Sequence, residues 1–290
     1  MPVANGERQP TRGFPTDYRR DFSTISNRFA LVNHGFDIDE VALQNWSAED
    51  TDILVIADPR EPYSQEAMER LQDYLDEGGD MVLLVEQQST RSVDLLLGNL
   101  GLSRGAALSQ AHDEGYPETL VLGSMAGSPL TSYWGEASLL PVGLEGAVEL
   151  LELDDAQDFE RTPIITAAEA HRVGAGASRK PNDQSPIVGY SLERQIDGES
   201  QRILVFGDAD LYSTARAERR DPVTANGLMG AFHYLTEGQY PVQRTRRDTI
   251  DTTLRIERTG IEAMRWALVG GVPLMILSIG GFLLLVRSRR

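Results

Sequence analysis

The chain has 290 residues, a formal net charge of −17 at pH 7 and a pI of about 4.6. An acidic surface repels phosphate backbones, so no nucleic-acid partner is expected. The chain contains no cysteine, which excludes disulfides, cysteine-ligated zinc and thiol catalysis together. The length suits one large domain or two small ones with a sizeable apolar core.

The first 22 residues are polar and contain three prolines but no apolar stretch. This composition predicts a disordered lead-in and argues against a signal peptide. A soluble α/β domain is then expected over residues 23–243, followed by a charged connector over 244–264. An apolar segment over 265–287 and a basic tail over 288–290 complete the predicted organisation.

Strand-like and helix-like stretches alternate along the soluble part. Short continuous apolar runs are typical of strands that are buried on both faces, and amphipathic runs are typical of surface helices. The alternation predicts βαβ units and a parallel sheet flanked by helices. The strands are expected at Asp52–Ala57, Met81–Val85 and Arg202–Phe206, and the helices at Ser26–Asn33, Gln65–Glu77 (capped by Ser64), Val93–Leu100 and Val223–Leu235.

The middle of the chain is less regular. A stretch rich in glycine, serine and proline, Val173–Pro186, predicts an exposed loop. Short strands are expected on both sides of it, at Thr119–Leu122, Val148–Leu153 and Ile187–Leu192.

Residues Trp266–Val286 form an uncharged run of 21 residues. As a helix with a rise of about 1.5 Å per residue, the run would be about 31 Å long, which matches a bilayer core. The sequence therefore predicts one C-terminal transmembrane helix in a cell (inner) membrane, in contact with membrane lipid.

The charge pattern leaves the orientation of that helix open. Five arginines lie in the twenty residues before the run and three follow it, which favours a cytoplasmic soluble domain. An extracytoplasmic domain would need an upstream membrane segment to export it.

The sharpest local feature is Gly207-Asp208-Ala209-Asp210, directly after a predicted buried strand. Ligands of open parallel sheets bind beyond the carboxyl ends of strands, and Asp58 follows another such strand. Asp58, Asp208 and Asp210 are therefore candidate ligand-binding residues that could hold a hard cation such as Mg²⁺. Capping of the following turns and helices explains the same aspartates without a ligand, and no metal site of recognisable spacing is present.

The sequence shows no catalytic set, so an enzyme and a cofactor are not expected. The four histidines form neither an HxH nor an HExxH pattern, and no serine lies in a G-x-S-x-G elbow. A glycine-rich phosphate loop is absent as well, so this chain would not hydrolyse ATP.

Four segments occur in an order that carries a family likeness: SNRFALVNHGFDIDEVAL, DTDILVIADPREPYSQEAMERLQDYLDEGGDMVLLVE, RILVFGDADLYS and NGLMGAFHYLTEG. With the C-terminal apolar run and basic tail, they make the chain resemble the Gldg family over about residues 20–290. These proteins are auxiliary components of gliding-motility-type ABC transporters, and the likeness is strongest to members fused behind an ABC-2 type permease.

The resemblance implies a class I glutamine-amidotransferase-like fold on the extracytoplasmic side of the membrane. It also implies an ABC-2 type permease and a cytoplasmic ATPase subunit as partners. The amidotransferase nucleophile is a cysteine, which this chain lacks, so no catalytic residue is carried over. Fused members have permease helices upstream, which suggests that this chain is a C-terminal fragment or a split gene.

Two functions follow as expectations. The first is a non-catalytic auxiliary subunit of an ABC-type transport system, whose soluble domain binds permease, cargo or an envelope partner. The alternative is a membrane-anchored metal-dependent enzyme or ligand-binding protein that uses Asp58, Asp208 and Asp210.

Overall fold

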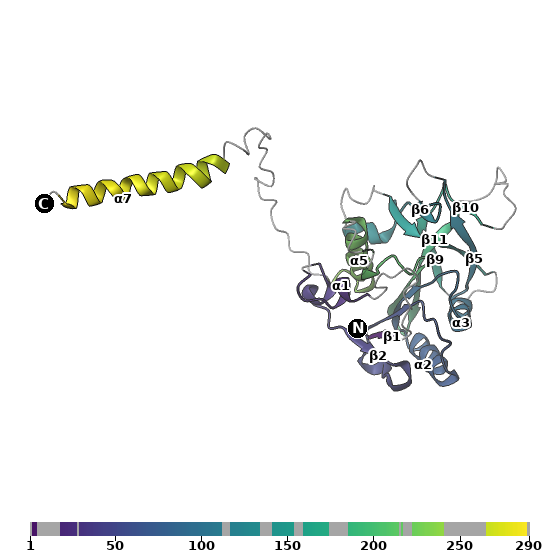
Figure 1. Cartoon of the computed structure of the whole chain (residues 1–290). Helices are drawn as coiled ribbons and strands as arrows, with labels where there is room; N and C mark the ends of the chain where they lie inside the picture. Colours follow the sequence, from purple (N-terminus) through teal and green to yellow (C-terminus); the bar gives the residue numbers. More distant parts are fainter. Residues whose placement is uncertain are drawn as a thin grey trace. The chain divides into compact units, whose positions relative to one another are not determined.

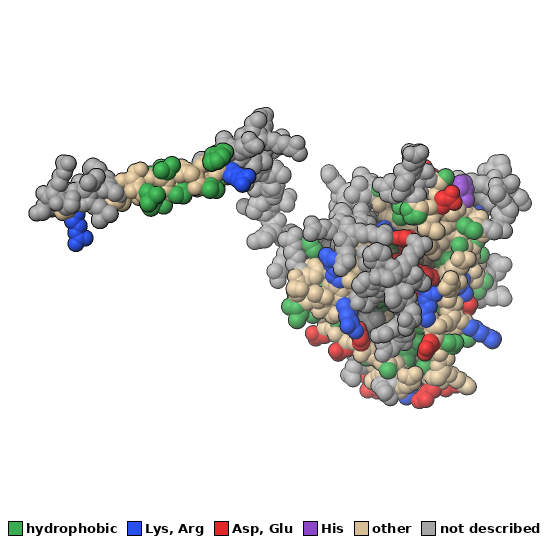
Figure 2. Space-filling view, in the orientation of Figure 1, with side chains coloured by type: hydrophobic (Ala, Val, Ile, Leu, Met, Phe, Trp, Pro, Cys, Tyr) green, Lys and Arg blue, Asp and Glu red, His purple; other side chains and the backbone are tan. Residues whose placement is uncertain are grey.

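The structure, a computed structural model, falls into two units, Met1–Gln243 and Arg244–Arg290, which are described separately. It describes residues 2–4, 18–27, 29–111, 117–133, 141–153, 159–173, 185–214, 216, 222–240 and 265–288. On the visible face of the first unit, acidic side chains are scattered with arginine side chains between them (Figure 2).

A seven-stranded sheet forms the centre of the first unit (Figure 1). Its strand order is β2-β1-β3-β4-β12-β11-β9, and the first five of these strands run parallel. Their bounds are Asp39–Val41 (β2), Pro2–Ala4 (β1), Ile53–Ala57 (β3), Asp80–Leu84 (β4), Glu199–Phe206 (β12), Ile187–Ile196 (β11) and Glu160–Thr166 (β9).

The central strands are buried on both faces, which explains their continuous apolar sequences. Alternate residues of β3 point to opposite sides: Val55 joins one core cluster, and Leu54 and Ile56 join the other. Helices α2 (Gln65–Asp76) and α3 (Arg91–Asn99) cover the second side, and α5 (Pro222–Leu235) covers the first. The predicted strands at β3, β4 and β12 and the helices α2, α3 and α5 are thus confirmed.

The prediction of a parallel, glutamine-amidotransferase-like sheet is wrong, because the sheet is mixed. β11 and β9 run antiparallel to their neighbours at one side of it. β11 returns into β12 through a tight hairpin at Asp197-Gly198, where both residues have positive φ (52° and 91°). A type I′ turn needs this conformation at both central positions, and Asp-Gly is one of its preferred sequences.

Two smaller antiparallel sheets add to the departure from the prediction. One has the order β10-β5-β8 and the other pairs β6 with β7. Of their strands, β6 and β8 correspond to predicted strands. The bounds are His171–Arg172 (β10), Leu102–Ser109 (β5), Val148–Glu152 (β8), Leu120–Gly123 (β6) and Val142–Glu145 (β7).

The helix ends follow the expected signals. Ser64 caps α2 by accepting a hydrogen bond from the amide of Ala67 at 3.2 Å, and Gly78 follows that helix with φ 95°. The helix expected at Ser26–Asn33 is instead a set of turns followed by the 3₁₀ helix η1, Leu31–His34. The remaining short helices are α1 (Arg19–Phe22), η2 (Leu43–Asn45), η3 (Ala48–Asp50) and η4 (Pro129–Tyr133).

The second unit contains a π-helical turn, η6 (Ala267–Gly271), and a 17-residue helix, α7 (Val272–Ser288). The apolar run is divided between these two elements. Among the residues that the structure describes, no helix is both long and apolar enough to cross a membrane, which corrects the predicted transmembrane helix.

Several predicted segments lie wholly or partly outside the described residues: the connector, the end of the basic tail, and most of the Val173–Pro186 loop. Within the predicted lead-in, residues 2–4 form β1 and residues 19–22 form α1. Tyr18 contacts the domain directly, because its hydroxyl donates a hydrogen bond to the carbonyl of Ala209 at 2.8 Å.

Candidate functional site

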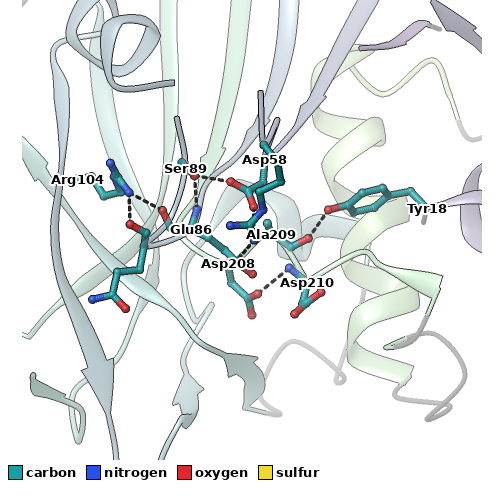
Figure 3. Close-up of polar contacts among 10 residues, drawn as sticks. Tyr18, Asp58, Glu86, Ser89, Arg104, Asp208, Ala209 and Asp210 are labelled. Carbon is teal, nitrogen blue, oxygen red and sulfur yellow. Dashed lines mark hydrogen bonds and ion pairs between the residues drawn. The ribbon is translucent and has the colours of Figure 1, made fainter. Parts of the chain in front are cut away.

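Three neighbouring parallel strands, β3, β4 and β12, end at one edge of the central sheet. Asp58 follows β3, Glu86 lies two residues after β4, and Asp208 lies two residues after β12. Open α/β sheets bind ligands at such an edge. We call Asp58, Glu86, Asp208 and Asp210 the strand-end carboxylates (Figure 3).

Asp58 is fully buried and its charge is matched by the chain itself. Its Oδ2 lies 2.8 Å from a guanidinium nitrogen of Arg60, and its Oδ1 accepts a hydrogen bond from the Ser89 hydroxyl at 2.5 Å. The same Arg60 nitrogen lies 2.9 Å from Glu86 Oε2, so Arg60 bridges two carboxylates. Ser89 also accepts the amide proton of Glu86 at 2.8 Å, which ties the loop after β4 to Asp58.

The backbone of Asp58 is in the left-handed region, with φ 41°. Aspartate tolerates this conformation better than most residues, at a cost of about 1–2 kcal/mol. The amide of Asp58 still donates to the carbonyl of Leu84 at 3.0 Å, so the turn begins directly from the β-ladder. The turn keeps the carboxylate inside the edge, where Arg60 and Ser89 meet it.

Asp208 is also fully buried, and it joins two segments of backbone. Its Oδ1 accepts the amide proton of Asp210 at 2.8 Å, and its Oδ2 accepts that of Glu145, at the end of β7, at 2.9 Å. Burial, together with the nearby charges of Asp210 and Glu86, raises the pKa of Asp208 to about 7. Arg216 and the Glu145 amide act in the opposite direction.

The residue before Asp208, Gly207, must be a glycine because another strand lies close to its backbone. Its amide donates to the carbonyl of Val188 at 2.7 Å, and its carbonyl accepts from the amide of Val148 at 2.7 Å. A Cβ at this position would lie only 2.2 Å from the carbonyl oxygen of Val148. Glycine is therefore required for β8 to approach the end of β12.

Within the described residues, Glu86, Asp208 and Asp210 each place one carboxylate oxygen within 4.8 Å of the others. These are the side chains that could hold a hard cation, since Mg²⁺ and Ca²⁺ prefer carboxylate oxygens. The structure thus brings two of the three predicted residues, Asp208 and Asp210, together with Glu86. It places Asp58 at the same edge but joins it to Glu86 through Arg60.

Glu86, Arg60 and Ser89 were not predicted from the sequence. Glu86 had an available signal, because it follows the apolar run Met81–Val85 just as Asp58 follows its own run. The sequence carries no signal for the bridging role of Arg60, because that role depends on the conformation of the turn at Asp58. Of the described histidines, His34, His171 and His233 lie on three different elements, and none belongs to the carboxylate group.

The chain matches no family model and no curated protein sequence. Among solved structures, it is similar to the mmIFT52 N-terminal domain, with 14% identity, a TM-score of 0.58, and coverage of 82% of this chain and 98% of that one. At this identity the likeness concerns the fold alone.

Two glycosidases are more distant. Exo-beta-1,4-mannosidase Op5Man5 from Opitutaceae bacterium strain TAV5 has 9% identity and a TM-score of 0.43, with coverage of 81% of this chain and 35% of that one. Alpha-L-fucosidase isoenzyme 2 from Paenibacillus thiaminolyticus has 10% identity and a TM-score of 0.48, with coverage of 74% and 29%. This chain thus spans about a third of each enzyme.

Proposed function

We propose that this chain is a non-catalytic auxiliary subunit of an ABC-type (ABC-2) transport system, whose α/β domain docks to the permease. One observation carries the proposal. The two buried aspartates of the strand-end carboxylates are held by the chain itself: Asp58 by an ion pair with Arg60 and a hydrogen bond from Ser89, and Asp208 by two backbone amides. An edge that is braced in this way supports a rigid docking domain better than a reacting centre.

The Gldg resemblance supplies the partners in this proposal. The IADPRE and GDAD segments that carry the resemblance are the two turns that the bonds of Asp58 and Asp208 hold in place. ATP hydrolysis would belong to a separate subunit. We place the domain at the cell membrane on its extracytoplasmic face, as the resemblance implies.

The test is an affinity pull-down of the full chain from gently solubilised native membranes, quantified by mass spectrometry. We expect an ABC permease and its ATPase in near-stoichiometric amounts. Recovery of the chain alone, in a detergent that keeps other ABC transporters intact, would overturn the proposal.

A matched variant separates docking from the alternative, a cation-dependent ligand-binding protein or enzyme. Asp210→Asn removes one carboxylate of the group formed with Glu86 and Asp208 and leaves both backbone bonds of Asp208 in place. The docking role predicts unchanged recovery of the partners and unchanged transport by the assembled system. Loss of transport with an intact complex would favour the alternative.

A further inference from the structure

An open pocket of about 380 Å³ lies at the loop after β4 and is lined by Gln87, Asp94, Ser103, Arg104 and Gly105. Its volume falls within the range of small-molecule sites. Its residues come from the loop after β4, from α3 and from β5.

A local irregularity in β5 shapes the pocket. The register between β5 and β8 shifts between Arg104 and Ala107, which marks a bulge. Gly105 lies in this bulge, and a Cβ there would be 3.2 Å from both the Glu149 carbonyl oxygen and Leu151 Cγ. The glycine therefore lets β8 lie close to β5.

The charges in the pocket cancel. The guanidinium of Arg104 makes two hydrogen bonds to the Asp94 carboxylate, at 3.0 and 2.9 Å. A third nitrogen of Arg104 donates to the carbonyl of Glu86 at 2.9 Å and also to the carbonyl of Gln87 (Figure 3). Four oxygen atoms thus accept hydrogen bonds from the guanidinium, while the Asp94 side chain remains 45% exposed.

Each charged class of ligand meets an obstacle here. An anion must displace Asp94 from Arg104, and a cation faces the guanidinium. An apolar ligand would displace water from the polar groups of Gln87, Ser103 and Asp94. It would offer no hydrogen bonds in place of those that these groups make with water. A neutral molecule with several hydroxyl groups can both donate to Asp94 and accept from Ser103 and Gln87.

We propose that this pocket binds a neutral polyhydroxylated small molecule of the sugar or polyol class. Because Arg104 holds the carbonyls of Glu86 and Gln87, the bound molecule would also contact the loop that carries one strand-end carboxylate. The inference is independent of the docking role proposed above.

The experiment titrates the full chain with three six-carbon probes that differ in charge: glucose (neutral), gluconate (anionic) and glucosamine (cationic). Binding is followed by saturation-transfer difference NMR. For so open a site we expect millimolar affinity for glucose, and about five- to tenfold weaker binding of both charged probes. Equal binding of all three, or no binding of glucose up to about 50 mM, would overturn the proposal.

Two variants locate the site. Ser103→Leu fills the pocket and should abolish glucose binding, whereas Ser109→Leu, on the same strand outside the pocket, should bind glucose like the wild type. Asp94→Asn frees the guanidinium of Arg104 and should reverse the preference, so that gluconate binds more tightly than glucose. Thermal unfolding confirms that each variant is folded. Unchanged glucose binding by Ser103→Leu, or an unchanged order of probes for Asp94→Asn, would contradict the assignment.

Discussion

The two ends of the central sheet each gather carboxylates around one arginine, but they bury them differently. At the strand-end edge, Arg60 contacts Asp58 and Glu86, which are 0% and 13% exposed. At the opposite end, Arg202 contacts Glu193 and Glu237, which are 39% and 53% exposed. Water can hydrogen-bond to the exposed carboxylates around Arg202. The buried carboxylates around Arg60 must find their partners within the chain. Burial, rather than the number of charges, therefore decides how much the fold depends on a carboxylate.

The largest effect is expected when the buried contacts of Asp58 are removed. Asp58→Ala removes the partner of both Arg60 and Ser89 and should lower the free energy of unfolding by about 3–5 kcal/mol. Glu193→Ala, at the solvated end, should cost less than about 1 kcal/mol. Urea denaturation of both variants measures the contrast, and equal losses would refute it.

A backbone substitution tests the packing beneath the same edge. Gly207→Ala places a Cβ against the carbonyl oxygen of Val148 and should cost about 3 kcal/mol. Gly98, in α3, has open space around it, so Gly98→Ala should instead stabilise the protein by about 0.5–1 kcal/mol. A melting temperature of Gly207→Ala that does not fall below that of the wild type would show that β8 does not approach Gly207 as described.

The next effect separates Asp208 from Asp210. Asp208→Asn turns an amide NH₂ toward one of the two backbone N–H groups that the carboxylate accepts, and should cost about 1–3 kcal/mol. Asp210→Asn leaves both bonds and should cost clearly less. Amide hydrogen exchange at Glu145 and Asp210 provides a local readout, and protection that survives Asp208→Asn would contradict the brace.

The smallest effect is a pH dependence at the opposite end. Burial raises the pKa of Asp80 to about 7 from 3.8, with a smaller increase from Glu237 and Asp52, while its bond to the Arg202 amide opposes the shift. Because the pKa of Asp80 is higher in the folded state than in the unfolded state, its protonation stabilises the fold. This contribution is complete below pH 3.8 and is lost as the pH rises from there to about 7.

Asp80→Asn should therefore match the wild type near pH 3.5 and exceed it increasingly as the pH rises, by about 1 kcal/mol or more at pH 8, or roughly 2–4 °C in Tm. Asp73→Asn, on the exposed face of α2, gives the baseline. A difference that does not grow between pH 5 and pH 8 would rule out a buried, neutral Asp80.

How much the sequence could predict follows from the same physics. β3, β4 and β12 were predictable because burial on both faces forces continuous apolar runs, and α2 because Ser64 and Gly78 mark its ends. β5 and β9 carry charged residues, and β9 also Pro163, so neither has the expected pattern. The antiparallel hairpin of β11 and β12 was not predicted, although Asp197-Gly198 is a sequence typical of such a turn.

The sequence predicted the aspartates of the candidate site but not the groups that contact them. Asp58, Asp208 and Asp210 follow buried strands and therefore meet at one edge, as expected. Their partners were not foreseeable, because Arg60, Ser89 and the Glu145 amide reach them through turns and through a separate small sheet.

Thermal unfolding of the wild type in a chelator, and separately in excess Mg²⁺, Ca²⁺ and Mn²⁺, tests whether the strand-end carboxylates stabilise the fold without a bound cation. A ligand that binds the folded state alone raises Tm. We expect the same Tm in all four conditions, because the chain's own Arg60, Ser89 and backbone amides already hold the buried aspartates. A saturable increase in Tm that disappears in Asp210→Asn would contradict it and show that the edge is a cation site.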